Sequence, residues 1–176
     1  AAAPRVPPMA EIPDSPNAPL FGSGGRGRDF PELPPAKRAD IIEGFNANNR
    51  KYFSGTMGFH VVDLREGYAR LVADNTTAQQ QPAGVMHGGA SFGLADTAVA
   101  AALFTIYGFG QLMLTIEMKI NFLEPIPPGE VIAEAYVLRS SRRSAYAEAD
   151  IWSQGKLAGR ASTTYMIKPF PQPENS

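Results

Sequence analysis

One long helical segment most constrains what this chain can fold into. It runs from Gly88 or Gly89 to about Tyr107, and Gly108 and Gly110 end it. Small side chains let a β-sheet approach a helix closely, so the segment predicts a single central helix with a sheet curled around it. The small residues of the segment are Ala90, Gly93, Ala95, Ala98, Ala100, Ala101 and Ala102.

Segments with strand character lie on both sides of this helix in the sequence. A shorter helix is predicted over 36–53, ahead of the first two strands. Within 112–123, strict alternation predicts Ile116, Met118, Ile120 and Phe122 on one side of a strand, and Thr115, Glu117, Lys119 and Asn121 on the other. Short turns join the later strands, so the sheet is expected to be antiparallel and the fold class α+β. The other strands are predicted at 59–64, 68–73, 131–139, 144–153 and 157–167.

The chain of 176 residues predicts one domain over 36–169, between an N-terminal arm over 1–35 and a tail over 170–176. Nine of the 16 prolines lie before Ala36, with few large apolar residues. Such a segment cannot repay its ordering entropy, so we expect it to be extended or disordered. It is either a simple tail or an arm that crosses a partner subunit, anchored by Leu20, Phe21 and Phe30. It contains no apolar stretch typical of a signal peptide.

The composition argues against several classes of protein. A net charge of −1 argues against a dedicated nucleic-acid partner. The absence of cysteine excludes disulfides, iron–sulfur clusters and thiol nucleophiles, and a count of two histidines argues against a multi-histidine metal site. No uninterrupted apolar run approaches the roughly 18–20 residues that a membrane span requires. We therefore expect a cytoplasmic protein without metal, nucleic acid or membrane, and its 44% apolar residues suffice for a packed core.

The start of the long helix carries the most chemical information. His87 precedes Gly88 and Gly89, which open the helix. The first N–H groups of a helix have no internal partner and lie at the positive end of its dipole, so they can hold an anion or a developing oxyanion. Glycine there lets a substrate oxygen approach the backbone. A glycine-rich junction between loop and helix, without chemistry, explains the same pattern.

Asp96 lies about two turns into this otherwise apolar helix. Aspartate is unfavourable in the middle of a helix, and a buried carboxylate is costly without a partner. One interpretation is a structural aspartate that bonds a neighbouring strand. The other is a carboxylate placed to attack a carbonyl group or to activate water. Spacing alone leaves both interpretations open.

The run His87-Gly88-Gly89, followed by Asp96 in the context Leu94-Ala95-Asp96-Thr97-Ala98, resembles the hotdog-fold thioesterases of the phenylacetic-acid-degradation (PaaI) type. The strand 115–125, the segment 129–143 and the hairpin that includes 158–165 are also similar, so the resemblance covers about 45–167. It implies a hotdog fold, which agrees with the architecture expected above. It also implies hydrolysis of acyl-CoA thioesters without a cofactor, by homodimers or homotetramers whose sites are shared between subunits.

The resemblance also implies roles for individual residues. Asp96 would be the nucleophile or general base, and the backbone N–H of Gly88, with Gly89 beside it, would donate to the oxyanion. His87 falls on the histidine that shapes this site. Thr115 falls where the family commonly has a hydroxyl near the attacking water.

Two further sets of residues are candidates for the site. Gln81 stands where the family commonly has an asparagine, and its extra methylene changes the geometry of any contact. Arg139, Arg142 and Arg143 are either a solvated turn or a clamp for the CoA phosphates, because guanidinium matches phosphate geometry. The resemblance favours the clamp.

Two other functions remain open on the sequence. One is a hotdog protein that binds acyl-CoA or acyl-carrier protein without turnover. The other is an enoyl-thioester hydratase, whose chemistry usually pairs a carboxylate with a histidine. The position of His87 before the glycines fits an oxyanion site better. Several apolar residues are candidates either for an acyl pocket or for the core, namely Phe92, Phe104, Tyr107, Phe109 and Met113.

Overall fold

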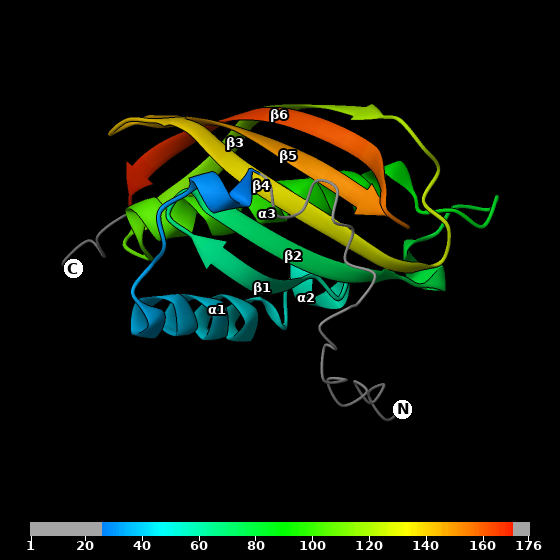
Figure 1. Ribbon diagram of the computed structural model, residues 1–176, viewed down its shortest axis with the longest axis horizontal. Coiled ribbons are helices and arrows are strands. Elements are labelled where there is room, and N and C mark those ends of the chain that lie inside the picture. The colour runs from blue at the N-terminus through cyan, green and yellow to red at the C-terminus, as the bar shows by residue number, and fades with distance from the viewer. Residues whose placement is uncertain (1–25, 171–176) are drawn as a thin grey trace, which may run out of the picture.

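The computed structural model describes residues 26–170. Two helices precede the first strand pair, a long helix follows it, and four strands complete the chain (Figure 1). The elements are η1 (Gly27–Asp29), α1 (Pro35–Asn49), α2 (Phe53–Thr56), β1 (His60–Arg65), β2 (Tyr68–Asn75), η2 (Thr77–Gln79), α3 (Gly88–Tyr107), β3 (Gln111–Phe122), β4 (Gly129–Ser140), β5 (Ser144–Ser153) and β6 (Lys156–Pro169). The predicted helix over 36–53 is therefore shorter, because the chain turns between α1 and α2.

The six strands form one antiparallel sheet in the order β1-β2-β4-β5-β6-β3. Figure 1 shows this sheet curled around α3, with α1 lying beside β1. A curled antiparallel sheet around one long helix is the hotdog fold, so the predicted α+β fold class is confirmed. Two of the pairings join strands that are distant in sequence, namely β2 with β4 and β3 with β6.

Helix α3 forms the centre of the core because its side chains are small or apolar. Leu94, Val99 and Leu103 are fully buried, and the alanines between them let the strands approach. This helix has the length and hydropathy of a membrane span, although polar residues interrupt its apolar run. In this fold 56% of that apolar window is buried inside the molecule.

A β-bulge in β3 changes the side on which Thr115 lies. The register of β3 against β6 shifts between Thr115 and Glu117, with Ile116 as the extra residue. Strict alternation placed Thr115 opposite Met118, and that prediction is wrong. An extra residue reverses the phase of alternation, so Thr115 and Met118 both face the α3 side of the sheet.

The part of the predicted arm that the structure describes is packed rather than extended. The Phe30 ring lies 6.1 Å from each of the rings of Tyr68 and Tyr136, on the sheet face opposite α3. The Arg26 guanidinium lies 4.2 Å over the Tyr136 ring. Aromatic and cation–π contacts thus order this segment, although its composition predicted an extended or disordered arm. The proposed anchors Leu20 and Phe21 lie outside the described residues, as does the predicted tail after Phe170.

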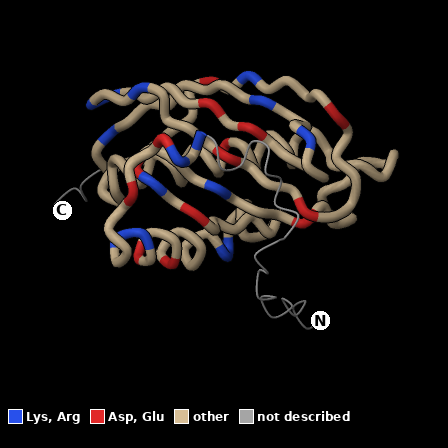
Figure 2. Tube along the Cα trace, viewed as in Figure 1, with Lys and Arg blue, Asp and Glu red and all other residues tan. Residues whose placement is uncertain are grey.

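The outer face of the sheet carries charges of both signs on adjacent strands. Arg70, Glu134, Asp150 and Arg160 are consecutive cross-strand neighbours on β2, β4, β5 and β6. Figure 2 shows basic and acidic residues interspersed over this face. Opposite charges therefore meet in the pairs Arg70–Glu134 and Asp150–Arg160, the latter bonded at 2.6 Å, whereas Glu134 and Asp150 are neighbours of like charge.

Candidate active site

The side chain of His87 makes a hydrogen bond with one of the two glycines that open α3 and not with the other. Its Nδ1 accepts the N–H of Gly89 at 2.9 Å, which caps the helix. Because Nδ1 is the acceptor, a neutral ring carries its proton on Nε2. The N–H of Gly88 donates to no acceptor within residues 26–170. Of the two predicted donors, therefore, Gly88 alone is free for a ligand in this arrangement.

A hollow of about 360 Å³ lies beside Gly88, and we call it the donor hollow. A Cβ added at Gly88 would lie 3.1 Å from the ring of Phe122, so the close approach of that ring favours glycine. The ring is 57% exposed and forms one wall. The lining residues are Met86, Gly88, Ser91, Phe122, Leu123, Glu124, Pro125 and Ile126.

Gln81 lies in the turn that leads into this helix. Its backbone accepts from Gly84 at 2.9 Å, and its side-chain oxygen accepts from the N–H of Ala83 at 3.3 Å. Those bonds hold the turn and leave the side-chain amide N–H groups available. Among the described residues, no hydrogen bond joins Gln81 to His87 or Gly88.

The Asp96 carboxylate is held through one oxygen only. The hydroxyls of Thr115 and Tyr165 both donate to Oδ1, Thr115 at 2.8 Å. Tyr165 also donates to the backbone carbonyl of Asp96 at 3.0 Å. Oδ2 receives no hydrogen bond from the described part of the chain. The two sequence interpretations thus meet in one residue: Asp96 bonds neighbouring strands and still presents a free oxygen.

Tyr165 is the site residue that the sequence reasoning missed. Burial, and then the adjacent Asp96 carboxylate, raise the pKa of its phenol above the ordinary value. The phenol therefore stays protonated and acts as a donor at physiological pH. Its position on the buried side of β6 was readable from alternation, but its pairing with Thr115 across β3 and β6 depends on strand order.

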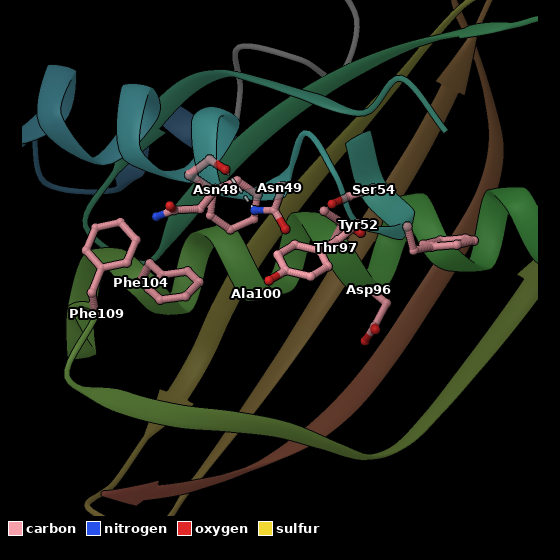
Figure 3. Close-up of a pocket in the computed structure, with 11 residues that line it drawn as sticks. Asn48, Asn49, Tyr52, Ser54, Asp96, Thr97, Ala100, Phe104 and Phe109 are labelled. Atoms are coloured by element: carbon pink, nitrogen blue, oxygen red, sulfur yellow. Dashed lines mark hydrogen bonds between the residues drawn. The ribbon is translucent and has the colours of Figure 1, made fainter. Parts of the chain in front are cut away.

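A second hollow, of about 390 Å³, lies beside Asp96 between α1, α2 and α3. We call it the aromatic pocket. Figure 3 shows Asp96 at one end and Phe104 and Phe109 at the other, with the Asp96 carboxylate pointing away from α1. The lining residues are Phe45, Asn48, Asn49, Tyr52, Phe53, Ser54, Asp96, Thr97, Ala100, Phe104 and Phe109. Of the five apolar candidates, Phe104 and Phe109 line this pocket, Tyr107 and Met113 pack against the core, and Phe92 is 37% exposed.

Within one chain, the donor and the carboxylate are far apart. Gly88 and Asp96 lie on the same helix, eight residues from each other. At a rise of 1.5 Å per residue, this separation is about 12 Å along the axis. Both groups cannot contact one thioester carbonyl within a single chain.

The predicted arginines lie at the opposite end of α3 from Gly88. The turn between β4 and β5, which carries Arg142 and Arg143, bonds the helix end through the Tyr107 hydroxyl and the Ser141 carbonyl at 2.7 Å. Tyr107 lies roughly 28 Å along the axis from Gly88 at the same helical rise. All three arginines, including Arg139, are exposed and form no ion pair within residues 26–170.

Comparison with known proteins adds the family. A family model described as the thioesterase superfamily matches residues 83–159. An esterase-named protein of Archaeoglobus fulgidus is 30% identical over 114 residues, which are 62% of this chain and 71% of that protein. The chain belongs to the thioesterase superfamily.

Other similar proteins carry thioesterase or PaaI names. The proofreading thioesterase EntH of Klebsiella pneumoniae is 27% identical over 108 residues, covering 61% of this chain and 79% of EntH. The structure of a mutant of the phenylacetic acid degradation protein PaaI of Thermus thermophilus matches with a TM-score of 0.60 and 27% identity. That match covers 65% of this chain and 96% of the PaaI chain. The resemblance to PaaI-type hotdog thioesterases is confirmed, and superfamily membership supports thioester hydrolysis as the general chemistry.

Proposed function

We propose that the protein hydrolyses acyl-CoA thioesters to the free acid and CoA, at sites that two copies of the chain share. The observation that carries this proposal is the separation of two half-sites on α3. The Gly88 N–H is a free donor at a helix start, and Asp96 is a carboxylate with one free oxygen about 12 Å away. A second copy brings the Asp96 of one chain to the Gly88 of the other.

The geometry gives each group a part in acyl transfer. The carbonyl oxygen of the thioester sits on the Gly88 N–H, where the helix dipole stabilises the negative charge that develops. Oδ2 of Asp96 attacks the carbonyl carbon, or removes a proton from a water molecule that does so. When water attacks, the C–S bond breaks and the CoA thiolate takes up the proton that Asp96 removed from that water. When Asp96 attacks, the C–S bond breaks to leave an acyl–Asp96 anhydride, which a water molecule then hydrolyses, and a proton from that water passes to the CoA thiolate. Both routes release the free acid and restore the Asp96 carboxylate.

The remaining side chains position these two groups. Thr115 and Tyr165 hold Oδ1 and thereby fix the direction of Oδ2. His87 occupies the Gly89 N–H, so the substrate oxygen meets a single backbone donor from this pair. We propose that His87 and Gln81, which precede the start of α3, supply further donors toward the thioester, namely the Nε2–H of His87 and the amide N–H of Gln81.

Exposed apolar side chains on the sheet edge favour assembly with a second copy. Within residues 26–170 strand β3 pairs only with β6 and leaves its other edge open, and Ile116 on β3 is 60% exposed. Phe122 and Leu123 are also more than half exposed, at the donor hollow. Open, apolar strand edges favour pairing with another chain, and here that pairing would cover the half-site around Gly88.

Complementation between two inactive variants tests the shared site. Asp96→Ala removes the carboxylate, and Gly88→Val places a side chain against the Phe122 ring at the donor. Mixed dimers contain one site with both groups intact, so reassembled mixtures should regain activity that neither variant has alone. A monomer by sedimentation, or no recovery after confirmed subunit exchange, contradicts the proposal. Release of free thiol from acyl-CoA distinguishes hydrolysis from binding without turnover.

We also propose that Arg142 and Arg143 bind the CoA phosphates, with Arg139 beside them. They are exposed and unpaired within the described residues, so their charge is available to an anion. The double change to alanine should raise KM severalfold with little effect on kcat, because these contacts are remote from the carbonyl. If the double variant keeps the wild-type KM, and the wild-type KM does not rise with added salt, the arginines form only a solvated turn and do not bind the phosphates.

A further inference from the structure

We propose that the aromatic pocket holds the acyl group, and that it selects an unbranched alkyl chain of medium length over a single aromatic ring. The inference rests on the proposed function, because it assigns the hollow beside Asp96 to the acyl part of a thioester. It goes further by naming the substrate class and the residues that set it.

The pocket is elongated along one face of α3. Asp96, Ala100 and Phe104 follow each other at intervals of four residues, so they lie in line on the helix surface. Eight residues correspond to about 12 Å of helix. The small side chain of Ala100 leaves the middle of this line open, so a chain that starts at Asp96 can extend along the helix.

An aromatic wall closes the far end of the pocket. The rings of Phe104 and Phe109 lie 4.7 Å apart, and Phe45 meets Phe104 edge-on at 5.5 Å. Phe45 is 4% exposed and belongs to the core, whereas Phe109 is 45% exposed in the connection between α3 and β3. The wall therefore limits chain length, and Phe109 is the part of it that can be removed without opening the core.

The near end of the pocket, at the Asp96 backbone, is narrow. The Phe53 ring rests on Gly93 of α3, where an added Cβ would lie 2.6 Å from a ring carbon. Phe53 is 56% exposed and meets the buried Phe59 ring edge-on at 6.0 Å. A ring held this close to the helix leaves little width next to Asp96, which disfavours a branch near the carbonyl.

The size of the pocket exceeds what one ring needs. An apolar cavity of about 150 Å³ suffices for benzene. The aromatic pocket measures about 390 Å³, and four phenylalanines and Ala100 supply its apolar lining. A phenyl group would leave much of that apolar surface uncovered, while an alkyl chain reaching Phe109 would cover it.

The first experiment measures kcat/KM for unbranched acyl-CoAs from acetyl to palmitoyl, and for phenylacetyl-CoA, with the full chain. Each methylene that enters the pocket should raise kcat/KM by about fourfold, until the chain reaches the aromatic wall. Phenylacetyl-CoA should fall at least tenfold below the best alkyl substrate. A flat profile, or acetyl- or phenylacetyl-CoA as the best substrate, would overturn the inference.

A variant of the wall tests the assignment directly. Phe109→Ala should move the optimum to longer chains, because it opens the far end. Leu138→Ala is the matched control, since Leu138 is similarly exposed at 46% and lies on β4 outside the pocket. The same optimum in Phe109→Ala and in the control would overturn the role of the wall.

Binding without turnover separates this inference from the proposed function. Calorimetry with 1-hexanol, 1-octanol and 1-decanol measures chain binding, and Phe109→Ala should again shift the preference. If no acyl-CoA is hydrolysed but this shift is seen, the proposed function fails and the pocket assignment stands. If thioesters are hydrolysed but alcohol binding ignores Phe109, the pocket assignment fails alone.

Discussion

Two carboxylates in this protein are each held by tyrosine, yet only one is accessible. Tyr165 donates to Asp96 beside α3, and Tyr68 and Tyr136 donate to Glu134 on the outer face of the sheet at 2.7 and 3.2 Å. Asp96 is partly exposed and keeps one oxygen free. Glu134 is 0% exposed, and both of its oxygens are occupied.

The segment at the start of the described chain accounts for much of this difference. Phe30 packs on Tyr68 and Tyr136, and Arg26 lies over Tyr136, so together they cover the rings around Glu134. Burial raises the pKa of Glu134 above its ordinary value. A buried carboxylate whose two oxygens both accept hydrogen bonds affects only the stability of the fold. A carboxylate with a free oxygen beside a pocket can react. The burial of an acidic residue is therefore a poorer guide to function than a carboxylate oxygen that lacks a hydrogen-bond partner.

The largest expected effect is on Asp96. Asp96→Asn should lower kcat on the order of 10²-fold or more, because the amide is neither a nucleophile nor a base. Its oxygen still accepts from Thr115 and Tyr165, so the melting temperature should change little. Steady-state kinetics with an acyl-CoA panel and thermal unfolding measure both, with exposed Asp74→Asn on β2 as the control. Turnover near that of the control would remove Asp96 from the mechanism.

Phe30→Ala should destabilise the fold without slowing the reaction. Losing the ring removes contacts with both Tyr68 and Tyr136, which we expect to cost about 2 kcal/mol of unfolding free energy. Urea unfolding measures this loss, and kcat below the transition should equal that of the wild type. A large fall in kcat at full folding would show that the outer face communicates with the site.

Tyr165→Phe should slow turnover about tenfold, because it removes a hydrogen bond to a charged carboxylate. Tyr146→Phe is the control, with a tyrosine that is 41% exposed on β5. A fall in stability with turnover equal to that of the control would make Tyr165 structural only.

The smallest effect is expected from Glu134→Gln, and it concerns stability alone. Glu134 has a raised pKa in the folded state, so below its unfolded pKa of about 4.5 its protonated form contributes fully to stability. That contribution is lost as pH rises from there toward the folded pKa. The variant has no such group, so its unfolding free energy relative to the wild type should rise with pH across this interval. Chemical denaturation at a series of pH values measures this rise. A loss of kcat like that of Asp96→Asn would contradict the contrast between a structural Glu134 and a reactive Asp96.

Local patterns predicted the secondary structure closely. Helix α3 begins at Gly88 and ends at Tyr107, as its glycines and alanines indicated, and the strands agree within a few residues. Those signals are local, because periodicity and helix ends depend on neighbouring residues. The exceptions have tertiary causes: the bulge at Ile116 and the packing of Phe30 on the sheet.

The sequence by itself determined that a carboxylate and a glycine-opened helix start lie on one helix, since both positions are fixed by the count of residues. Only the tertiary structure decided what surrounds them. The placement of β3 beside β6 brings Thr115 and Tyr165 to Asp96, and the fold of His87 onto its own helix leaves Gly88 as the free donor. Strand order and side-chain rotamers depend on contacts between segments distant in the chain, and no local pattern specifies those contacts.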